Sequence, residues 1–154
     1  MIAHAAFPNL DLQERDRNGK LLPSSLSPAI ISKLLRDELE FEGLVLTDDL
    51  EMGAISRHCE IEDAAVRAAK AGEDMLLICA SPDKIQRGYR ALLAAAKNGR
   101  LPETRIKQSL NRIAQTKAII QPPLPLDLAR FQQLADEVLQ LNAKLNYVYG
   151  GPVK

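Results

Sequence analysis

The sequence has few aromatic residues and no block of basic charge. Aromatic residues make up 4% of its 154 residues, tryptophan is absent, and 20 Lys and Arg balance 20 Asp and Glu. Nucleic-acid binding depends on clustered positive charge and on aromatic stacking. No nucleic-acid partner is therefore expected, and a small uncharged or polar ligand fits this composition better.

Cysteines and long apolar runs are also scarce. The two cysteines, Cys59 and Cys79, lack the number and spacing of a disulfide framework, and no Cys-x-x-Cys pair is present. Both are expected to be buried thiols in a reducing compartment. The N-terminus lacks a signal-peptide pattern, and no apolar run approaches the roughly 20 residues that span a bilayer. The sequence predicts a soluble, cytoplasmic protein with no membrane partner, no metal and no other cofactor.

Three short apolar runs are typical of buried strands. They read MIAHAAF at the start of the chain, GLVLT at 43–47 and DMLLICA at 74–80. Each run is continuous and does not alternate with polar residues, which suits parallel strands that are covered on both faces.

Helical periodicity fills most of the remaining chain. Apolar residues recur at near-helical spacing over 27–39, 61–71, 81–98, 103–119 and 127–145. Ser-Pro pairs begin two of these segments, as expected for an N-cap followed by proline in the first turn. The prolines of QPPLPLD separate the last two helices, and the tail after Asn146 is expected to be loose.

Alternation of strands and helices predicts a parallel α/β architecture, either an open doubly wound sheet or part of a (β/α)8 barrel. Three strands cannot close a barrel, which typically needs about 250 residues. If the chain forms a barrel, roughly its first half is missing.

Two adjacent carboxylates follow the second apolar run. Asp48 and Asp49 stand at the end of GLVLT, and in both parallel architectures the ligand binds at the carboxyl ends of the strands. A side chain at that position is held rigidly, which suits a nucleophile. Aspartate is also a favoured N-cap, with a contribution of about 1 kcal/mol. From spacing alone, catalysis and helix capping both remain open.

The surrounding residues resemble a known family. The segment SLSPAIISKLLRDELEFEGLVLTDDLEMGAI is similar to the strand-end signature of glycoside hydrolase family 3, in particular its bacterial β-N-acetylhexosaminidase branch. MIAHAAFPNLD, IEDAAVRAAKAGEDMLLIC and LPETRIKQSLNRIAQTK resemble the flanking elements in the same order. The branch assignment rests on TDDLEM and on the chain ending soon after the last of these segments.

This resemblance implies a fold and a division of the chain. Residues 1–121 would form the C-terminal part of the family's catalytic (β/α)8 barrel, with about three parallel strands and flanking helices, incomplete as a barrel alone. Residues 122–154 would hold the proline-rich break, a C-terminal helix and the loose tail.

The resemblance also implies an activity. Asp48 would be the nucleophile of a retaining glycosidase that releases terminal β-linked N-acetylglucosamine, as in peptidoglycan recycling. Asp49 is expected to support the loop or the substrate. His4 matches the family's first strand, where it would either line the pocket or be buried and hydrogen-bonded to backbone. Met52 would form the pocket wall or pack beneath the loop.

The general acid of such a mechanism has no counterpart in the sequence. The family branch places a histidine held by an aspartate after a KHFPGHG-like segment, and no such segment occurs here. His58 is expected at the solvated end of a short helix, without a catalytic role. The chain would therefore need an N-terminal half-barrel partner, or would self-associate through its uncovered edges.

Two other functions are considered. The half-barrel could be catalytically inactive and serve as an interaction or split-enzyme subunit. Alternatively, the pair Asp48 and Asp49 could belong to a receiver-like domain that binds a metal or accepts a phosphoryl group. The strand DMLLICAS ends without the further acidic and lysine residues that such a domain needs, which disfavours the receiver.

Overall fold

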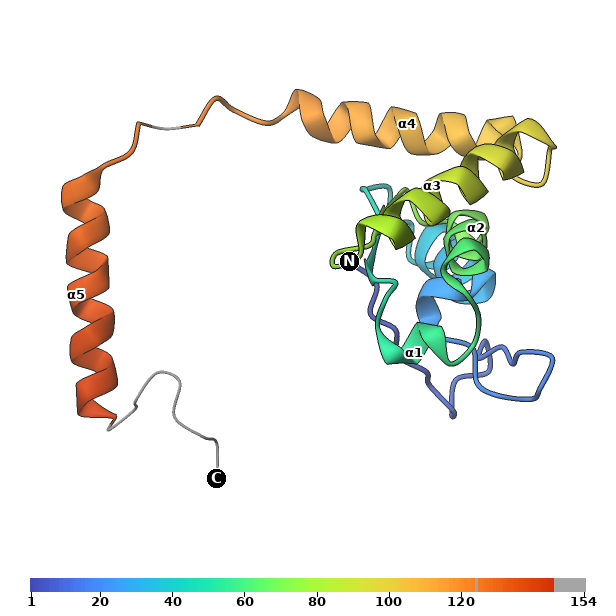
Figure 1. Cartoon of the computed structure of the whole chain (residues 1–154), viewed down its shortest axis with the longest axis horizontal. Helices are drawn as coiled ribbons and strands as arrows, with labels where there is room; N and C mark the ends of the chain where they lie inside the picture. The colour runs from blue at the N-terminus through green and yellow to red at the C-terminus, as the bar shows by residue number, and fades with distance from the viewer. Residues whose placement is uncertain (124, 146–154) are drawn as a thin grey trace. The chain divides into compact units, whose positions relative to one another are not determined.

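The computed structural model describes residues 1–123 and 125–145 and divides into two compact units, Met1–Ile120 and Gln121–Lys154 (Figure 1). The tail that was expected to be loose after Asn146 lies outside the described residues. Each unit is described separately below. The first unit contains the sheet and every predicted site residue.

The sheet of the first unit is small and parallel. Strand β1 (Leu46–Asp49) pairs with strand β2 (Met75–Leu77). Ile2 bridges to Thr47 in the same direction, with its N–H donating to the carbonyl oxygen of Leu46 at 2.8 Å. The predicted first strand is thus reduced to one bridge, because regular pairing does not extend beyond Ile2. The other two strands form where the apolar runs predicted them, with β1 ending later, at Asp49.

The pairing of β1 with β2 shifts register at the carboxylates. Leu46 lies opposite Met75 and Asp49 lies opposite Leu77, so β1 has one more residue than β2 over this interval. The buried hydroxyl of Thr47 accepts the backbone N–H of Leu77 at 2.9 Å. Such irregularities bend a strand and redirect its side chains. Here the irregular interval contains Thr47 and Asp48.

The long helices agree with the predicted segments. They are η2 (Ala29–Glu38), α2 (Ile61–Ala71), α3 (Pro82–Lys97) and α4 (Glu103–Ala118). The short helix η1 (Ser24–Leu26) was not predicted, and α1 (Gly53–Ser56) is a short helix before His58. The first of the long predicted helices is η2, which is wound as a π-helix: the N–H of Leu39 donates to the carbonyl of Leu34, five residues earlier. Ser81 caps α3 by accepting the N–H of Lys84.

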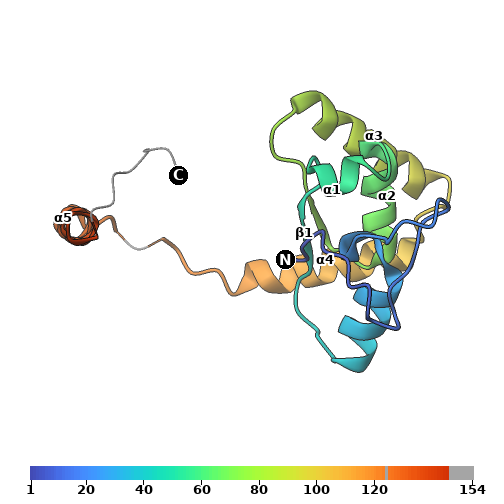
Figure 2. The same cartoon turned by 90° about the horizontal axis from the view of Figure 1, so that it is seen from below.

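The core lies between the sheet and α2, which packs against α3 (Figure 2). Several alanines of α2 are fully buried, and their small side chains let the two helices approach closely. Gly88 of α3 faces Ala65, and a Cβ at Gly88 would stand 2.7 Å from Cδ1 of Ile78. The contact leaves no room for a side chain at that position.

A buried carboxylate fixes the start of β2. The side chain of Asp74 has 0% exposure and accepts hydrogen bonds from three arginines, one serine and one backbone N–H: Arg36, Arg105, Arg112, Ser109 and Val45. Burial alone would raise the pKa of Asp74, but the hydrogen bond from Arg105 and the other donors outweigh it, so the pKa is lowered. The cluster ties η2 and α4 to the amino end of β2.

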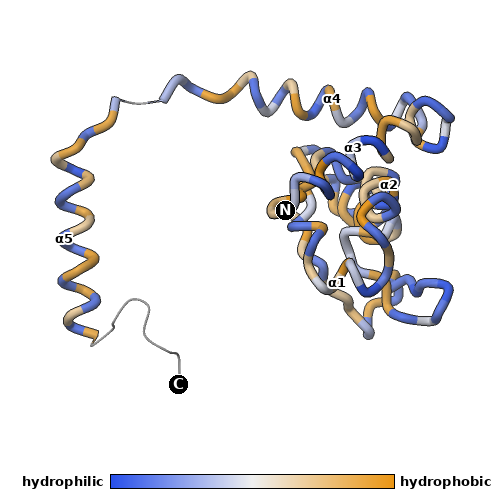
Figure 3. Tube along the Cα trace, in the orientation of Figure 1, coloured by the Kyte–Doolittle hydropathy of each residue, from blue (hydrophilic) through white to orange (hydrophobic). Residues whose placement is uncertain are grey.

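The second unit contains helix α5 (Leu128–Lys144). Asp127 caps it by accepting the N–H of Arg130 at 2.9 Å. Apolar and polar residues alternate along it with helical period (Figure 3). Most of its large apolar residues, among them Phe131 and Val138, are more than half exposed, and Leu134 is 43% exposed. Within residues 1–123 and 125–145, no helix combines the length and apolarity required to cross a membrane.

Candidate active site

Asp48 stands at the carboxyl end of β1 and is partly exposed. Its backbone N–H donates to the carbonyl oxygen of Ile2 at 3.0 Å, so its main chain is held by the sheet. Its Oδ1 accepts the N–H of Asp49 at 2.8 Å. This leaves a carboxylate on a fixed backbone at the strand end that is not committed to a distant part of the chain.

Asp49 is engaged differently. Its Oδ1 accepts the N–H of Glu51 at 3.0 Å and the N–H of Cys79, beyond β2, at 3.2 Å. Neither aspartate caps the following helix, because the N-cap of α1 is Met52, which makes no capping hydrogen bond through its side chain. The capping interpretation is therefore wrong for helix α1. Asp49 does cap the turn that follows β1, and it also joins the two strand ends.

Glu51 is a site residue that the sequence analysis missed. Its Oε2 accepts the N–H groups of Ala80 at 2.6 Å and Ser81 at 3.1 Å, and Oε1 lies 3.3 Å from Nζ of Lys84. Its side chain is 9% exposed. The backbone N–H of Ala80 is the main cause of the lowered pKa of Glu51. The two strand-end loops are therefore joined by carboxylates on one side and backbone amides on the other.

His4 supports the same turn from below. Its Nε2 lies 2.9 Å from the carbonyl oxygen of Asp49, and its Nδ1 lies 2.6 Å from Oγ of Ser25. Since a carbonyl can only accept, Nε2 carries the proton in this arrangement, and the Ser25 hydroxyl donates to Nδ1 when the ring is neutral. The ring is thus hydrogen-bonded to backbone, which was one of the two roles expected for His4.

The structure also tests the expectations for His58, Cys79 and Met52. His58 was predicted to be solvated, but its side chain is 10% exposed and its Nδ1 lies 3.0 Å from Oδ2 of Asp16. The prediction was wrong because the loop that carries Asp16, 42 residues earlier, covers the imidazole. Cys79 is exposed, contrary to the expected buried thiol. Met52 is 45% exposed, so it does not pack beneath the loop.

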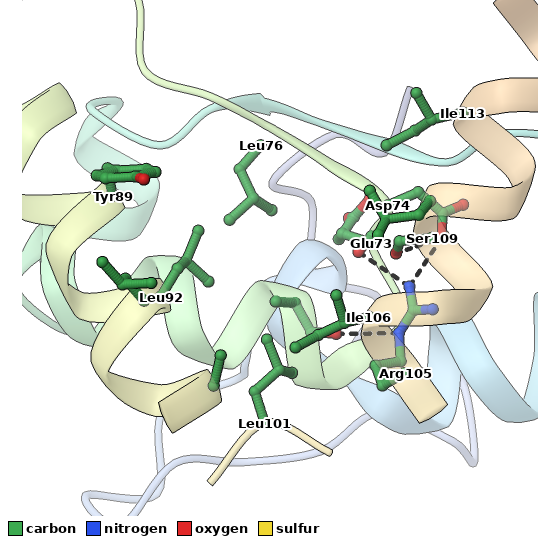
Figure 4. A pocket seen from close by; sticks show the side chains of 14 residues that line it. Glu73, Asp74, Leu76, Tyr89, Leu92, Leu101, Arg105, Ile106, Ser109 and Ile113 are labelled. Atoms are coloured by element: carbon green, nitrogen blue, oxygen red, sulfur yellow. Dashed lines mark hydrogen bonds and ion pairs between the residues drawn. The ribbon is translucent and has the colours of Figure 1, made fainter. Parts of the chain in front are cut away.

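A groove of about 390 Å³ lies elsewhere, between β2, α3 and α4 (Figure 4). Its walls are mostly apolar, with Leu76, Tyr89 and Leu110 among them. Glu73 also lines it, is 2% exposed, and has no hydrogen-bond partner for either carboxyl oxygen. Burial raises the pKa of Glu73 to about 8. Asp48 is not among the residues that line this groove.

The strand-end carboxylates do not form a metal centre in the described part of the chain. Among residues 1–123 and 125–145, no three His, Cys, Asp or Glu side chains gather closely enough to hold an ion. Oδ1 of Asp49 and Oε2 of Glu51 accept backbone N–H groups, and Oε1 of Glu51 faces Lys84. The arrangement suits a single reactive carboxylate with a rigid surround.

Sequence and structure comparisons agree on one family. Residues 1–116 match the family described as "Glycosyl hydrolase family 3 N terminal domain". A β-hexosaminidase of Idiomarina loihiensis is 37% identical over 79 residues, which is 51% of this chain and 21% of that protein. A β-hexosaminidase of Nitrosomonas eutropha is 28% identical over 145 residues, which is 92% of this chain and 36% of that protein.

Solved structures give the same result. A glycoside hydrolase family 3 β-N-acetylglucosaminidase from Paenibacillus sp. str. FPU-7 has a TM-score of 0.64 and 37% identity, covering 69% of this chain and 21% of that one. The chain thus spans about a fifth to a third of the length of these relatives. With three quarters of its length matched by the family, the chain belongs to glycoside hydrolase family 3.

Proposed function

We propose that this chain carries the nucleophile of a retaining β-N-acetylhexosaminidase, and that Asp48 is that nucleophile. In this role the carboxylate oxygen of Asp48 attacks the anomeric carbon, and the bond to the leaving oxygen breaks. The product is a glycosyl ester, which water then hydrolyses. Relatives named β-hexosaminidase and β-N-acetylglucosaminidase support this class of substrate.

The observation that carries the proposal is the difference between three neighbouring carboxylates. Asp49 and Glu51 each accept backbone N–H groups from the loop after β2. Among residues 1–123 and 125–145, the side chain of Asp48 accepts only the N–H of the next residue, while its main chain is fixed by Ile2. A nucleophile needs this combination of a rigid backbone and an uncommitted oxygen.

The proposal extends to the parts of the barrel. Residues 1–121 serve as the C-terminal portion of a (β/α)8 catalytic barrel, and residues 122–154 follow it as a separate segment. The general acid comes from a KHFPGHG-like segment, which residues 1–154 do not contain. His4 donates to the carbonyl of Asp49, and His58, although held by Asp16, does not follow such a segment. His4, Asp49 and Met52 shape the sugar site. The substrate is terminal β-linked N-acetylglucosamine of the type recycled from peptidoglycan in the cytoplasm.

The test uses a substrate that does not need a general acid. 2,4-Dinitrophenyl β-N-acetylglucosaminide has a leaving group that departs unprotonated, so attack by the nucleophile can release dinitrophenolate without a general acid. We expect the wild-type chain to release dinitrophenolate and Asp48→Asn to lose the activity by about 10³-fold or more. The control is Asp37→Asn, an exposed carboxylate of η2 whose removal should change nothing. Equal rates for wild type and Asp48→Asn would overturn the proposal.

A second candidate function is an inactive half-barrel that pairs with another polypeptide. It is favoured by the apolar groove beside β2, whose rim residues Tyr89 and Leu110 are 65% and 58% exposed. Adding the polypeptide that precedes the matched segment in the Nitrosomonas eutropha relative distinguishes the two. Turnover only after this addition favours the split enzyme, and binding without turnover favours the inactive module. Self-association in light scattering favours pairing between copies.

A further inference from the structure

We propose that Glu51 is a positioning residue for Asp48, which it serves by tying the loop after β1 to the loop after β2. The inference rests on the proposed role of Asp48 and deepens it. We assign Glu51 no direct contact with the substrate, because both of its carboxyl oxygens already have partners within the chain. Its effect on the reaction is exerted through the backbone.

The contacts form a continuous clamp. Asp49 accepts the N–H of Cys79, and Glu51 accepts the N–H groups of Ala80 and Ser81. Two carboxylates separated by one residue thus bind three consecutive amides, 29 to 30 residues further along the chain.

Strand pairing does not reach the loop after β2. The N–H of Leu50 donates to the carbonyl of Leu77 at 2.9 Å, which is at the end of the paired segment. β2 is three residues long and ends at Leu77. The amides of residues 79–81 lie past its end, so they are fixed by Asp49 and Glu51 in place of strand pairing.

The clamp ends one peptide away from the proposed nucleophile. The N–H of Asp49 donates to Oδ1 of Asp48, and Oδ1 of Asp49 accepts the N–H of Glu51. A shift of Glu51 therefore moves the peptide that orients the Asp48 carboxylate. Misplacement of a reacting group by about 1 Å can cost about 100-fold in rate.

The hydrogen-bond acceptor, and not the charge, is the required feature. Lys84 pairs with Oε1 at 3.3 Å but is 42% exposed, so solvent screens this contact. The two amide hydrogen bonds converge on Oε2 in a 9% exposed side chain. Glutamine keeps an oxygen for the amides, whereas alanine removes both acceptors. Glu51→Gln and Glu51→Ala are therefore a matched pair.

The experiment measures covalent labelling of the full chain by 5-fluoro-N-acetylglucosaminyl fluoride. The Asp48 oxygen forms a bond to C1, the C1–F bond breaks, and fluoride leaves with the bonding electron pair. The fluorine on C5 slows hydrolysis of the ester, so the adduct accumulates and its mass is counted over time. Hydrogen exchange at the Ala80 and Ser81 amides is followed in the same variants to report whether the clamp is closed.

We expect Glu51→Ala to lower the maximal labelling rate constant by about 10-fold to 100-fold. The reagent concentration for half-maximal rate should stay unchanged, and the amides of residues 80 and 81 should exchange faster. Glu51→Gln should label within about threefold of wild type, since the acceptor is kept. The control Glu62→Ala removes an ion pair with Arg87 elsewhere in the fold and should label as wild type does.

Two results would overturn the inference while leaving the role of Asp48 intact: Glu51→Ala labelling at the wild-type rate, or Glu51→Gln labelling as slowly as Glu51→Ala. If Glu51→Ala loses labelling because it unfolds, circular dichroism detects the unfolding. The labelling rate of Glu51→Gln then decides whether the inference holds. If the wild-type chain itself is not labelled, the proposed function fails, and this inference fails with it.

Discussion

Replacing Glu73 by glutamine should make the protein less sensitive to alkaline pH. Glu73 is 2% exposed, and within residues 1–123 and 125–145 neither of its carboxyl oxygens has a hydrogen-bond partner. Burial raises its pKa from 4.5 to about 8; the charge of Asp74 also raises it, whereas those of the α-amino group of Met1, Arg105 and Arg36 lower it. Between pH 4.5 and about 8, Glu73 therefore keeps its proton in the folded chain and loses it in the unfolded chain.

The direction and size of the pH effect follow from the difference between the folded and unfolded pKa of Glu73. Because the pKa of Glu73 is higher in the folded state, its protonation contributes to the free energy of unfolding. This contribution is fully present below pH 4.5 and is lost as the pH rises to about 8. The shift corresponds to roughly 3–5 kcal/mol at about 1.4 kcal/mol per pKa unit. Glutamine is neutral throughout and does not lose this stability. For a chain of this size, the gain amounts to roughly 10 °C in melting temperature.

The assay is urea unfolding followed by circular dichroism at pH 5.0 and pH 8.5. We expect Glu73→Gln to match the wild type closely at pH 5.0 and to exceed it at pH 8.5. The control is Glu38→Gln, an exposed carboxylate of η2, which should track the wild type at both values. Parallel stability curves for Glu73→Gln and wild type would refute the reasoning, because they would show that Glu73 ionises without penalty in the folded chain.

Three further predictions concern packing and helix ends. Asp74→Asn should cost about 3–5 kcal/mol in urea unfolding, because three guanidinium groups lose their buried counter-charge. Gly88→Ala should cost about 1–3 kcal/mol in the same assay, because its Cβ would stand 2.7 Å from Ile78. Asp127→Ala should weaken the start of α5 by about 1 kcal/mol, seen as faster amide exchange at Arg130.

Helix positions could be predicted from sequence because their signals are local. The Ser-Pro start of α3 and the apolar period of α2 need only neighbouring residues, and both helices form where the sequence placed them. The placement of Asp48 at a strand end was also predictable, since the apolar run before it is continuous. These features depend on contacts within a few residues.

The remaining features depend on partners far apart in the chain. Within the register shift between Leu46 and Asp49, the Thr47 hydroxyl accepts an amide N–H 30 residues away. Glu51 was missed for the same reason, since its amide partners follow the next strand. His58 was expected to be solvated, and the residue that buries it precedes it by 42 positions. Side-chain to backbone pairing over such distances leaves no periodic signal in sequence.

The central claim is that Asp48 bonds covalently to the anomeric carbon of the sugar. Its most direct test is peptide mapping by mass spectrometry after the wild-type chain is treated with 5-fluoro-N-acetylglucosaminyl fluoride. The account predicts one added N-acetyl-5-fluoroglucosaminyl group, on Asp48, and none in Asp48→Asn. A label on Asp49, on Glu51 or on any other side chain, with Asp48 unmodified, would contradict it.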